Sequence, residues 1–263
     1  MYKLPKKEYN KVRPIFADIE DNRANVFAAI EGNSINRIFV DNAEQPTAAL
    51  IALGWCFLGG SEKNAEFNHD LKELFVTEIM PKLDDGHFMV YSFSDEWKQI
   101  LDEMLKDYNV SRINRTVLDL DPDLFRKRHS GWRERIPEGC RIQRVDGQLA
   151  EGLPGIDSSW GSVDNFLAKG FGFCVMKGDE IISRCSTVHV GGGRTETSIK
   201  TEKEYRRQGF GALAACAYIE HCLESGLLPE WGCFYNEASG LIAEKLGFVH
   251  RRDVQVNYVK VDK

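Results

Sequence analysis

The sequence predicts an α/β fold, in which helices pack on a mixed sheet in an α+β manner, divided into two domains. The chain has 263 residues, and a domain commonly contains about 100–200 residues. Segments with strand-like and helix-like hydrophobic patterns alternate along both halves of the chain. A stretch rich in turn-forming and charged residues separates the halves. Together these observations favour a smaller N-terminal α/β domain followed by a C-terminal domain.

The N-terminal half contains four helical patterns and four strand patterns. Apolar residues from Phe67 to Ile79 recur at helical spacing, and Pro81 lies just beyond them. Ser94 occupies an N-cap position before a further helical segment. We therefore expect helices over residues 8–17, 24–31, 66–79 and 95–106, and strands over residues 36–41, 48–58, 88–93 and 113–120.

The pattern breaks over residues 121–139, where turn residues surround a basic stretch. We expect an N-terminal domain over residues 1–125, a basic linker over residues 126–139 and a second domain over residues 140–263. The basic stretch has two interpretations, a solvated linker or a source of positive charge for a nearby anionic ligand.

The C-terminal half shows clear turn and cap signals. Gly178 and Asp179 predict a hairpin turn between two strands, and Gly226 follows a long helical segment at the usual C-cap place. We expect strands over residues 140–145, 171–177, 181–190, 195–201, 231–235 and 254–261, and helices over residues 163–168, 209–224 and 237–246. The two halves share a similar order of elements, which leaves internal duplication and convergence as alternatives.

Composition excludes several classes of function. The net charge is −6, so the chain lacks the basic excess of a general nucleic-acid binder. No apolar run reaches the roughly eighteen residues of a membrane span, and the first twenty residues are too charged for a signal peptide. The seven cysteines are odd in number and form no C-x-x-C pair. We expect reduced thiols, no metal site and a cytoplasmic location.

One segment, Tyr205 to Leu213, carries the pattern of a ligand-binding loop. Gly209 and Gly211 remove side chains where a ligand would approach the backbone, and a helix starts between them. The first-turn N–H groups of a helix bind phosphate or pyrophosphate, and Arg206 and Arg207 add positive charge. A helix start that uses glycine for tight packing is the alternative.

The run Arg206-x-x-Gly209-x-Gly211 resembles the [RQ]-x-x-G-x-[GA] signature of the GNAT superfamily of acyl-CoA-dependent N-acetyltransferases. Downstream, Asn236 and the segment Ala243-Glu244-Lys245-Leu246-Gly247-Phe248 resemble a second hallmark of that family, in the correct order. The resemblance covers roughly residues 140–263 and predicts a GNAT-like C-terminal domain. The two-part chain also resembles the zwittermicin-resistance subgroup.

The resemblance implies roles for individual residues. The backbone of Ile199 and Thr201 would bind the pantetheine arm of acetyl-CoA, and Asn236 and Ser239 would contact its far side. The loop would hold the pyrophosphate through Arg206, Arg207, Gln208, Gly209, Phe210, Gly211 and Ala212.

Glu196 lies on the strand that leads to the loop and is the first candidate for the general base, with Glu202 as the second. At Ala243 the chain departs from the family, because many members have a tyrosine there that protonates the leaving thiolate. Tyr235, Tyr205 or solvent would have to supply that proton, and we assign Tyr235 to the candidate site.

We therefore expect an N-acetyltransferase that moves the acetyl group of acetyl-CoA to a primary amine of a small molecule. The alternatives are a CoA-binding regulatory protein that has lost catalysis, and an enzyme that modifies proteins. The expected partners include neither nucleic acid nor membrane, and a homodimer is left open. The N-terminal half lacks a cofactor loop and is interpreted as a degenerate GNAT-like half or a cover for the acceptor pocket. A fragment of about residues 130–263 is thus expected to retain acetyl-CoA binding.

Overall fold

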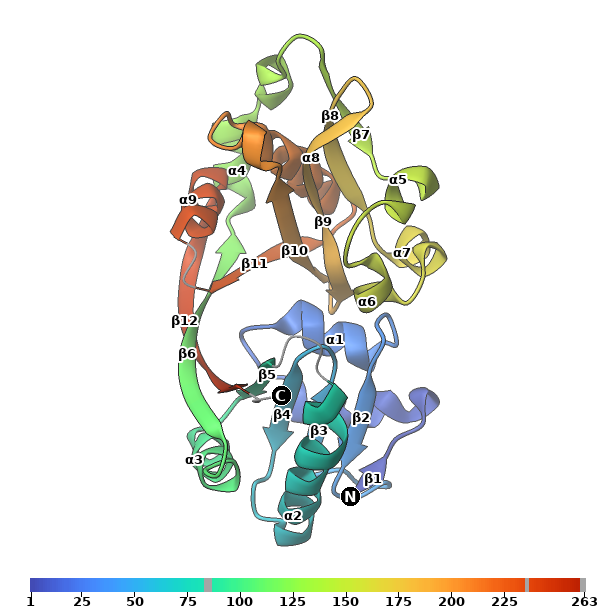
Figure 1. Cartoon of the computed structure of the whole chain (residues 1–263), viewed down its shortest axis with the longest axis vertical. Coiled ribbons are helices and arrows are strands. Elements are labelled where there is room, and N and C mark those ends of the chain that lie inside the picture. The colour runs from blue at the N-terminus through green and yellow to red at the C-terminus, as the bar shows by residue number, and fades with distance from the viewer. Residues whose placement is uncertain (83–86, 235–236, 261–263) are drawn as a thin grey trace. The chain divides into compact units, whose positions relative to one another are not determined.

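The computed structural model describes residues 1–82, 87–234 and 237–260. The chain forms two compact units, and both are discontinuous in sequence. Unit 1 contains Met1–Glu20, Ala29–Arg115 and Val254–Lys263, and unit 2 contains Asp21–Ala28 and Thr116–Asp253. The chain thus passes between the units more than once, whereas the sequence predicts one division near residues 126–139. Figure 1 draws the elements with the labels used below.

Unit 1 is a mixed sheet with helices packed against it. Its strands follow the order β1-β2-β3-β4-β5-β12, and only β4 and β5 are parallel among its registered pairs. The strands are β1 (Tyr2–Lys3), β2 (Arg37–Val40), β3 (Ala48–Ala52), β4 (Cys56–Gly60), β5 (His87–Ser92), the first part of β6 (Asn109–Leu120) and the end of β12 (Phe248–Lys260). The helices are the 3₁₀ helix η1 (Lys6–Phe16), α2 (Ala65–Leu74), a π-helical turn η2 (Phe75–Ile79), η3 (Met80–Lys82) and α3 (Asp95–Met104).

The core of unit 1 lies between these helices and the sheet. Phe67 and Leu71 of α2 and Trp97 of α3 pack against Leu58 and Val90 of the parallel strands. The Ser94 side chain accepts a hydrogen bond from the Trp97 N–H at 3.1 Å, which confirms the predicted N-cap. Helix α2 lies between β4 and β5 in the chain, and these parallel strands and the helix form a strand-helix-strand arrangement.

The predicted single strand over residues 48–58 is wrong. The structure has two antiparallel strands there, β3 and β4, joined by a tight turn in which the Leu53 N–H donates to the Trp55 carbonyl at 2.8 Å. Both strands are almost wholly buried. A continuous apolar run is typical of buried strands, so hydrophobicity did not separate them.

Unit 2 has the same strand-helix-strand arrangement in a longer form. Its strands follow the order β6-β11-β10-β9-β8-β7, with β10 and β11 parallel and the registered pairs among β7 to β10 antiparallel. The strands are the end of β6, β7 (Cys140–Arg144), β8 (Gly172–Lys177), β9 (Glu180–Gly191), β10 (Arg194–Thr201), β11 (Leu228–Phe234) and the start of β12. The helices are α4 (Pro122–His129), η4 (Trp132–Arg135), α5 (Gly147–Glu151), α6 (Ile156–Trp160), α7 (Val163–Lys169), η5 (Lys203–Tyr205), α8 (Phe210–Glu224), α9 (Glu237–Leu246) and most of α1 (Arg23–Ile30).

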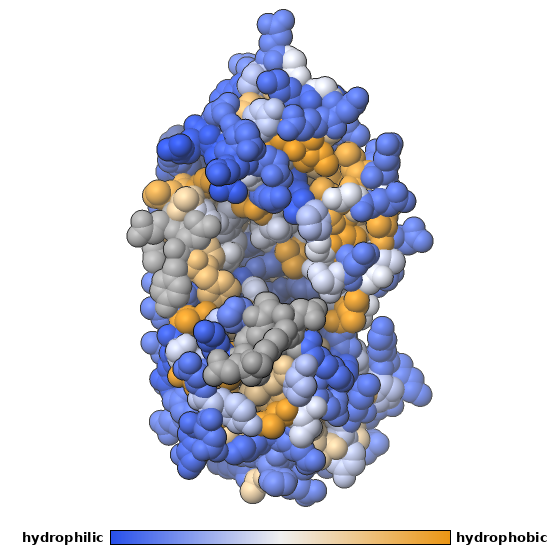
Figure 2. Space-filling model, in the orientation of Figure 1, coloured by the Kyte–Doolittle hydropathy of each residue, from blue (hydrophilic) through white to orange (hydrophobic). Residues whose placement is uncertain are grey.

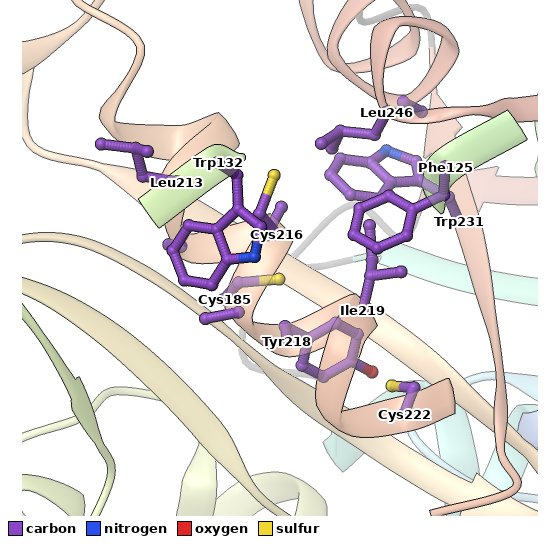
Figure 3. Close-up of a cluster of buried hydrophobic side chains, with 14 of the residues drawn as sticks. Phe125, Trp132, Cys185, Leu213, Cys216, Tyr218, Ile219, Cys222, Trp231 and Leu246 are labelled. Atoms are coloured by element: carbon purple, nitrogen blue, oxygen red, sulfur yellow. The ribbon is translucent and has the colours of Figure 1, made fainter. Parts of the chain in front are cut away.

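Helix α8 is the centre of the unit 2 core. It is apolar on nearly all sides, with ten buried residues, as expected of a helix enclosed by other elements. Figure 3 shows Ile219 of α8 near Phe125 of α4 and Trp231 of β11, and Leu213 on the other side of the cluster, toward Trp132. The Tyr218 hydroxyl donates to Thr195 Oγ1 at 2.7 Å, which satisfies a wholly buried polar group.

The basic stretch predicted as a linker contains helical structure. Residues 126–129 end α4, and Trp132–Arg135 forms η4. Phe125 and Trp132 belong to the core of unit 2, while Arg133 forms an ion pair with Glu220 on α8. The charged residues of this stretch therefore lie on the outer side of elements whose apolar residues are buried.

The last strands of the two halves are exchanged. The chain leaves α3 of unit 1 along β6, and β6 ends in unit 2 beside β11. The chain leaves α9 of unit 2 along β12, and Asn257 to Lys260 of β12 pair with His87 to Val90 of β5 in unit 1. Each unit is therefore completed by a strand that follows a helix of the other.

On the face drawn in Figure 2, hydrophilic side chains cover most of the surface and hydrophobic ones form small patches. No helix among the described residues is both long enough and apolar enough to cross a membrane.

Candidate functional site

The loop before α8 leaves the start of that helix open. Gly209 is the N-cap and has a φ of +89°, and Arg207 has a φ of +62°. A Cβ atom at Gly209 would meet no atom within 4 Å. The first turn contains no acidic residue, and the first N–H groups of a helix have no partner within it. The positive end of α8 therefore faces open space and suits an anion.

Hydrogen bonds within the loop fix its shape. Arg206 Nε donates to the Thr201 carbonyl at 3.1 Å, and Gln208 Nε2 donates to the Glu204 carbonyl at 2.9 Å. The first bond ties the loop to the end of β10. Phe210, the first residue of α8, is buried in the core and anchors the helix start, whereas Ala212 is half-buried.

Gly211 lies against the end of β10. A Cβ atom there would lie 3.1 Å from Thr201 Oγ1 and 3.4 Å from Ile199 Cδ1. The missing side chain therefore lets α8 pack closely on β10. The structure thus brings three predicted cofactor residues together, two from the strand and one from the helix.

The parallel strands β10 and β11 separate beside this loop. Among the described residues their register joins Arg194 to Leu228, Thr195 to Pro229 and Glu196 to Glu230. Strand β10 continues to Thr201, and Figure 1 shows the two strands diverging beyond the registered part. A register shift between β9 and β10 lies at the same level, after Glu196. The arrangement leaves an edge of β10 that an extended ligand could pair with.

Glu196, the first candidate base, is located at the level where this separation begins. Its side chain is 6% exposed. Because Thr195 contacts Tyr218 of α8, alternation along the strand turns Glu196 to the opposite face of the sheet. Glu202, the second candidate, is half-buried, and an ion pair with Lys200 at 2.9 Å lowers its pKa. Because Glu196 is buried, it is the stronger of the two candidates for the general base.

A buried glutamate that the sequence analysis missed lies next to Glu196. Glu230 is wholly buried, and its Oε2 accepts a hydrogen bond from the Ala24 N–H of α1 at 3.1 Å. Burial raises its pKa to about 7, and the negative charge of Glu196 adds to that effect. The signal in the sequence is an acidic residue between Pro229 and Trp231, at the start of an apolar strand.

Two arginines and an aspartate lie beside the pair of Glu196 and Glu230. Arg194 Nη1 donates to Asp119 Oδ1 at 2.9 Å and lies 3.5 Å from Glu230 Oε1. Arg252 donates to the other oxygen of Asp119 at 2.8 Å. Strands β6, β10, β11 and β12 therefore each contribute a charged residue to this face of unit 2.

Of the remaining residues considered from the sequence, two lie outside the described part of the chain and three lie within it. Tyr235 and Asn236 lie outside the described residues. Ser239 is on α9, where its hydroxyl accepts a hydrogen bond from Trp231 Nε1 at 3.0 Å. Ala243 is wholly buried in the unit 2 core. Tyr205 donates its hydroxyl proton to Glu180 at 2.9 Å, an interaction that raises the pKa of the tyrosine.

All seven cysteines are free thiols. Burial raises the pKa of Cys56, Cys216 and Cys222 to about 12, so these thiols stay protonated at neutral pH. Among the described residues, no group of three His, Cys, Asp or Glu side chains is arranged to hold a metal ion.

A family model described as GNAT acetyltransferase matches residues 13–256. The chain belongs to the GNAT acetyltransferase family. The match extends well into the N-terminal half, whereas the sequence motifs alone cover only residues 140–263. Membership implies an acyl-CoA-dependent acetyltransferase.

Three relatives of this GNAT chain match more than nine tenths of its length. It is 27% identical over 256 residues to the uncharacterised N-acetyltransferase YdfB of Bacillus subtilis strain 168, covering 94% of each chain. The crystal structure of a GCN5-related N-acetyltransferase-like protein from Streptococcus suis 89/1591 matches with a TM-score of 0.73 and 21% identity, over 96% of this chain and 98% of that one. A tandem GNAT protein from the clavulanic acid biosynthesis pathway matches with a TM-score of 0.62 and 12% identity, over 98% and 95% of the two chains.

The tandem neighbour shares the fold of the whole chain, including the N-terminal half. This agrees with the strand-helix-strand arrangement that units 1 and 2 have in common. The mixed α/β fold expected from the sequence is confirmed.

Proposed function

We propose that this GNAT chain transfers the acetyl group of acetyl-CoA to a primary amine of a small molecule. The observation that carries the proposal is the position of Glu196. It is buried on β10, at the level where β10 and β11 separate. Strand β10 is followed by η5 and then by the loop at the open start of α8. The candidate base and the candidate anion-binding helix start thus belong to one continuous segment of the chain.

In this proposal, different segments of unit 2 bind the pyrophosphate and the pantetheine arm of acetyl-CoA. The loop from Arg206 to Ala212 would hold the pyrophosphate, because the open positive end of α8 lies there. The backbone of Ile199 and Thr201 would pair with the pantetheine arm along the separated edge of β10. Asn236 and Ser239 would contact the far side of that arm, as the sequence resemblance implies.

In the proposed reaction Glu196 accepts a proton from the acceptor's ammonium group, which leaves a neutral amine to attack the thioester carbonyl. The leaving sulfur must then gain a proton. Tyr235 is the candidate donor, since Ala243 is buried and has no group to donate. Holding the amine against the thioester is the other task of the site.

The second candidate function is CoA binding without catalysis, which Ala243 favours. Calorimetric titration of acetyl-CoA, followed by thiol release in the presence of a panel of amines, distinguishes the two. The panel should include zwittermicin-like amines, because the sequence resembles that subgroup. Acetyl transfer to any member supports the proposed function, whereas binding without thiol release supports the second candidate.

The open helix start makes a prediction about affinity. Replacing Gly209 with valine places a side chain in the open space and strains a backbone with positive φ. We expect acetyl-CoA affinity to fall at least tenfold, about 1.4 kcal/mol, as measured by calorimetry.

Gly226 provides a matched control at the other end of α8. It also has a positive φ, +70°, and a Cβ atom there would meet nothing within 4 Å. Gly226→Val should therefore lose comparable stability and keep its affinity for acetyl-CoA. Equal affinity in the folded Gly209→Val and Gly226→Val proteins would contradict a pyrophosphate site at the loop.

A further inference from the structure

Two carboxylates lie side by side on one face of unit 2. Glu196 and Glu230 are register partners on adjacent parallel strands, so their side chains project to the same face. Both are buried, at 6% and 0% exposure. Two neighbouring buried carboxylates resist simultaneous ionisation, because each charge lacks water and repels the other.

The surroundings of the pair favour the proton on Glu230. Its Oε2 accepts from the Ala24 N–H, but its Oε1 accepts no hydrogen bond, and the nearest cation in the described structure is Arg194 at 3.5 Å. That arginine already donates to Asp119 at 2.9 Å. An ionised carboxylate is stable in a buried site only when it is well hydrogen-bonded, and Glu230 is only partly so.

Resting on the proposed function, we propose that Glu230 is a positioning residue that shares one proton with Glu196 and thereby sets the pH at which Glu196 acts as the base. While Glu230 holds the proton, Glu196 stays ionised and can accept a proton from the acceptor's ammonium group. When Glu230 ionises, its charge raises the proton affinity of Glu196 and makes it a stronger base. The proton that Glu196 takes from the ammonium passes to solvent or to ionised Glu230, and no other atom changes bonding in this step.

Other charged groups surround the pair of Glu196 and Glu230. Arg194 of β10, Asp119 of β6 and Arg252 of β12 form one ion-pair chain beside Glu230. Asp21, before α1, acts on Arg252. His189 is the register partner of Glu196 on β9 and is buried, which lowers its pKa to about 4 and keeps it neutral above pH 5. Burial and the charge of Glu196 raise the pKa of Glu230 to about 7.

The test compares the full-length protein with its Glu230→Gln variant across pH, using one acceptor amine from the panel. Dividing the two values of kcat/KM at each pH cancels the ionisation of the amine itself. We expect a ratio near one at pH 6 that rises to about fivefold in favour of the natural protein at pH 8.5. Acetyl-CoA affinity should be unchanged. A ratio that is constant across pH would overturn the proposal, because a purely structural role lowers activity equally at every pH.

Two further variants sharpen the comparison. Glu230→Asp keeps an ionisable group and should restore part of the pH-dependent ratio. Glu220→Gln removes one acid from the outer side of α8, where it pairs with Arg133, and should give a ratio without pH dependence. A pH-dependent ratio in Glu220→Gln equal to that in Glu230→Gln would assign the effect to net charge and overturn the proposal.

A direct titration separates this inference from the proposed function. Carboxyl carbon NMR of the natural protein, with the resonance assigned through Glu230→Asp, should show one glutamate that titrates near pH 7. This readout needs no acceptor and no activity. If no amine is acetylated but the resonance titrates near pH 7, the proposed function fails and the proton placement stands. If every glutamate titrates below about pH 5.5, the inference fails whatever the activity.

Discussion

Glu196→Gln should lower kcat/KM for acetyl transfer by about 10²–10⁴-fold, the usual cost of removing a general base. Glutamine has nearly the same shape as glutamate but accepts no proton at neutral pH. The residue lies on the face of β10 opposite α8, away from the open helix start, so acetyl-CoA affinity should remain unchanged. Steady-state kinetics and calorimetry on the same preparation measure both quantities.

Glu202→Gln tests the alternative base on the same strand connection. That carboxylate is paired with Lys200, so its pKa is lowered and it is a weaker base. We expect its loss to change kcat/KM by less than about threefold. Normal turnover in Glu196→Gln together with a large loss in Glu202→Gln would reverse the assignment.

A fragment of residues 130–263 should fail to fold and should not bind acetyl-CoA. The sequence alone predicts the opposite, because every cofactor motif lies in that range. In the structure, unit 2 also contains Asp21–Ala28 and residues 116–129. Leu118, Leu120 and Phe125 are buried in its core. Burial of each contributes about 1.5–3 kcal/mol, so their combined loss is comparable with the total stability of a domain, about 5–15 kcal/mol.

Circular dichroism and thermal unfolding of the fragment measure the loss directly. The matched control is co-expression of residues 1–129 and 130–263 as two chains, which together supply every strand of both units. We expect the pair to associate and to regain acetyl-CoA binding. A monodisperse fragment 130–263 that binds acetyl-CoA as tightly as the full chain would show that β6 is dispensable.

The structure confirms the helix predicted over residues 209–224, which is α8 (Phe210–Glu224), because its pattern is set by local chemistry. Gly209 adopts a positive φ, which glycine tolerates best, and α8 contains the run of small and apolar residues expected of a buried helix. Both features depend on residues close together in the chain. The resemblance to the GNAT signature at this loop agrees with the family match.

The parts that the sequence did not reveal depend on distant residues. Glu230 receives its hydrogen bond from Ala24, which is 206 positions earlier in the chain. Its raised pKa comes from burial and from Glu196 on another strand. Likewise, the turn between β3 and β4 has Gly54 as its only clear signal within a long apolar run. Neither the contacts of Glu230 nor the pairing of β3 with β4 is determined by the conformational preferences of neighbouring residues.

The exchange of β6 and β12 has a consequence for synthesis on the ribosome. Strand β5 of unit 1 has β4 on one side and β12 on the other, where Val90 pairs with Asn257. Strand β12 follows every other strand of both units in the sequence and is therefore translated after them. While the second half is being made, the nascent chain exposes an unpaired strand edge, which is prone to join other chains. We expect the nascent N-terminal half to need a chaperone, and slow C-terminal translation to prolong that need.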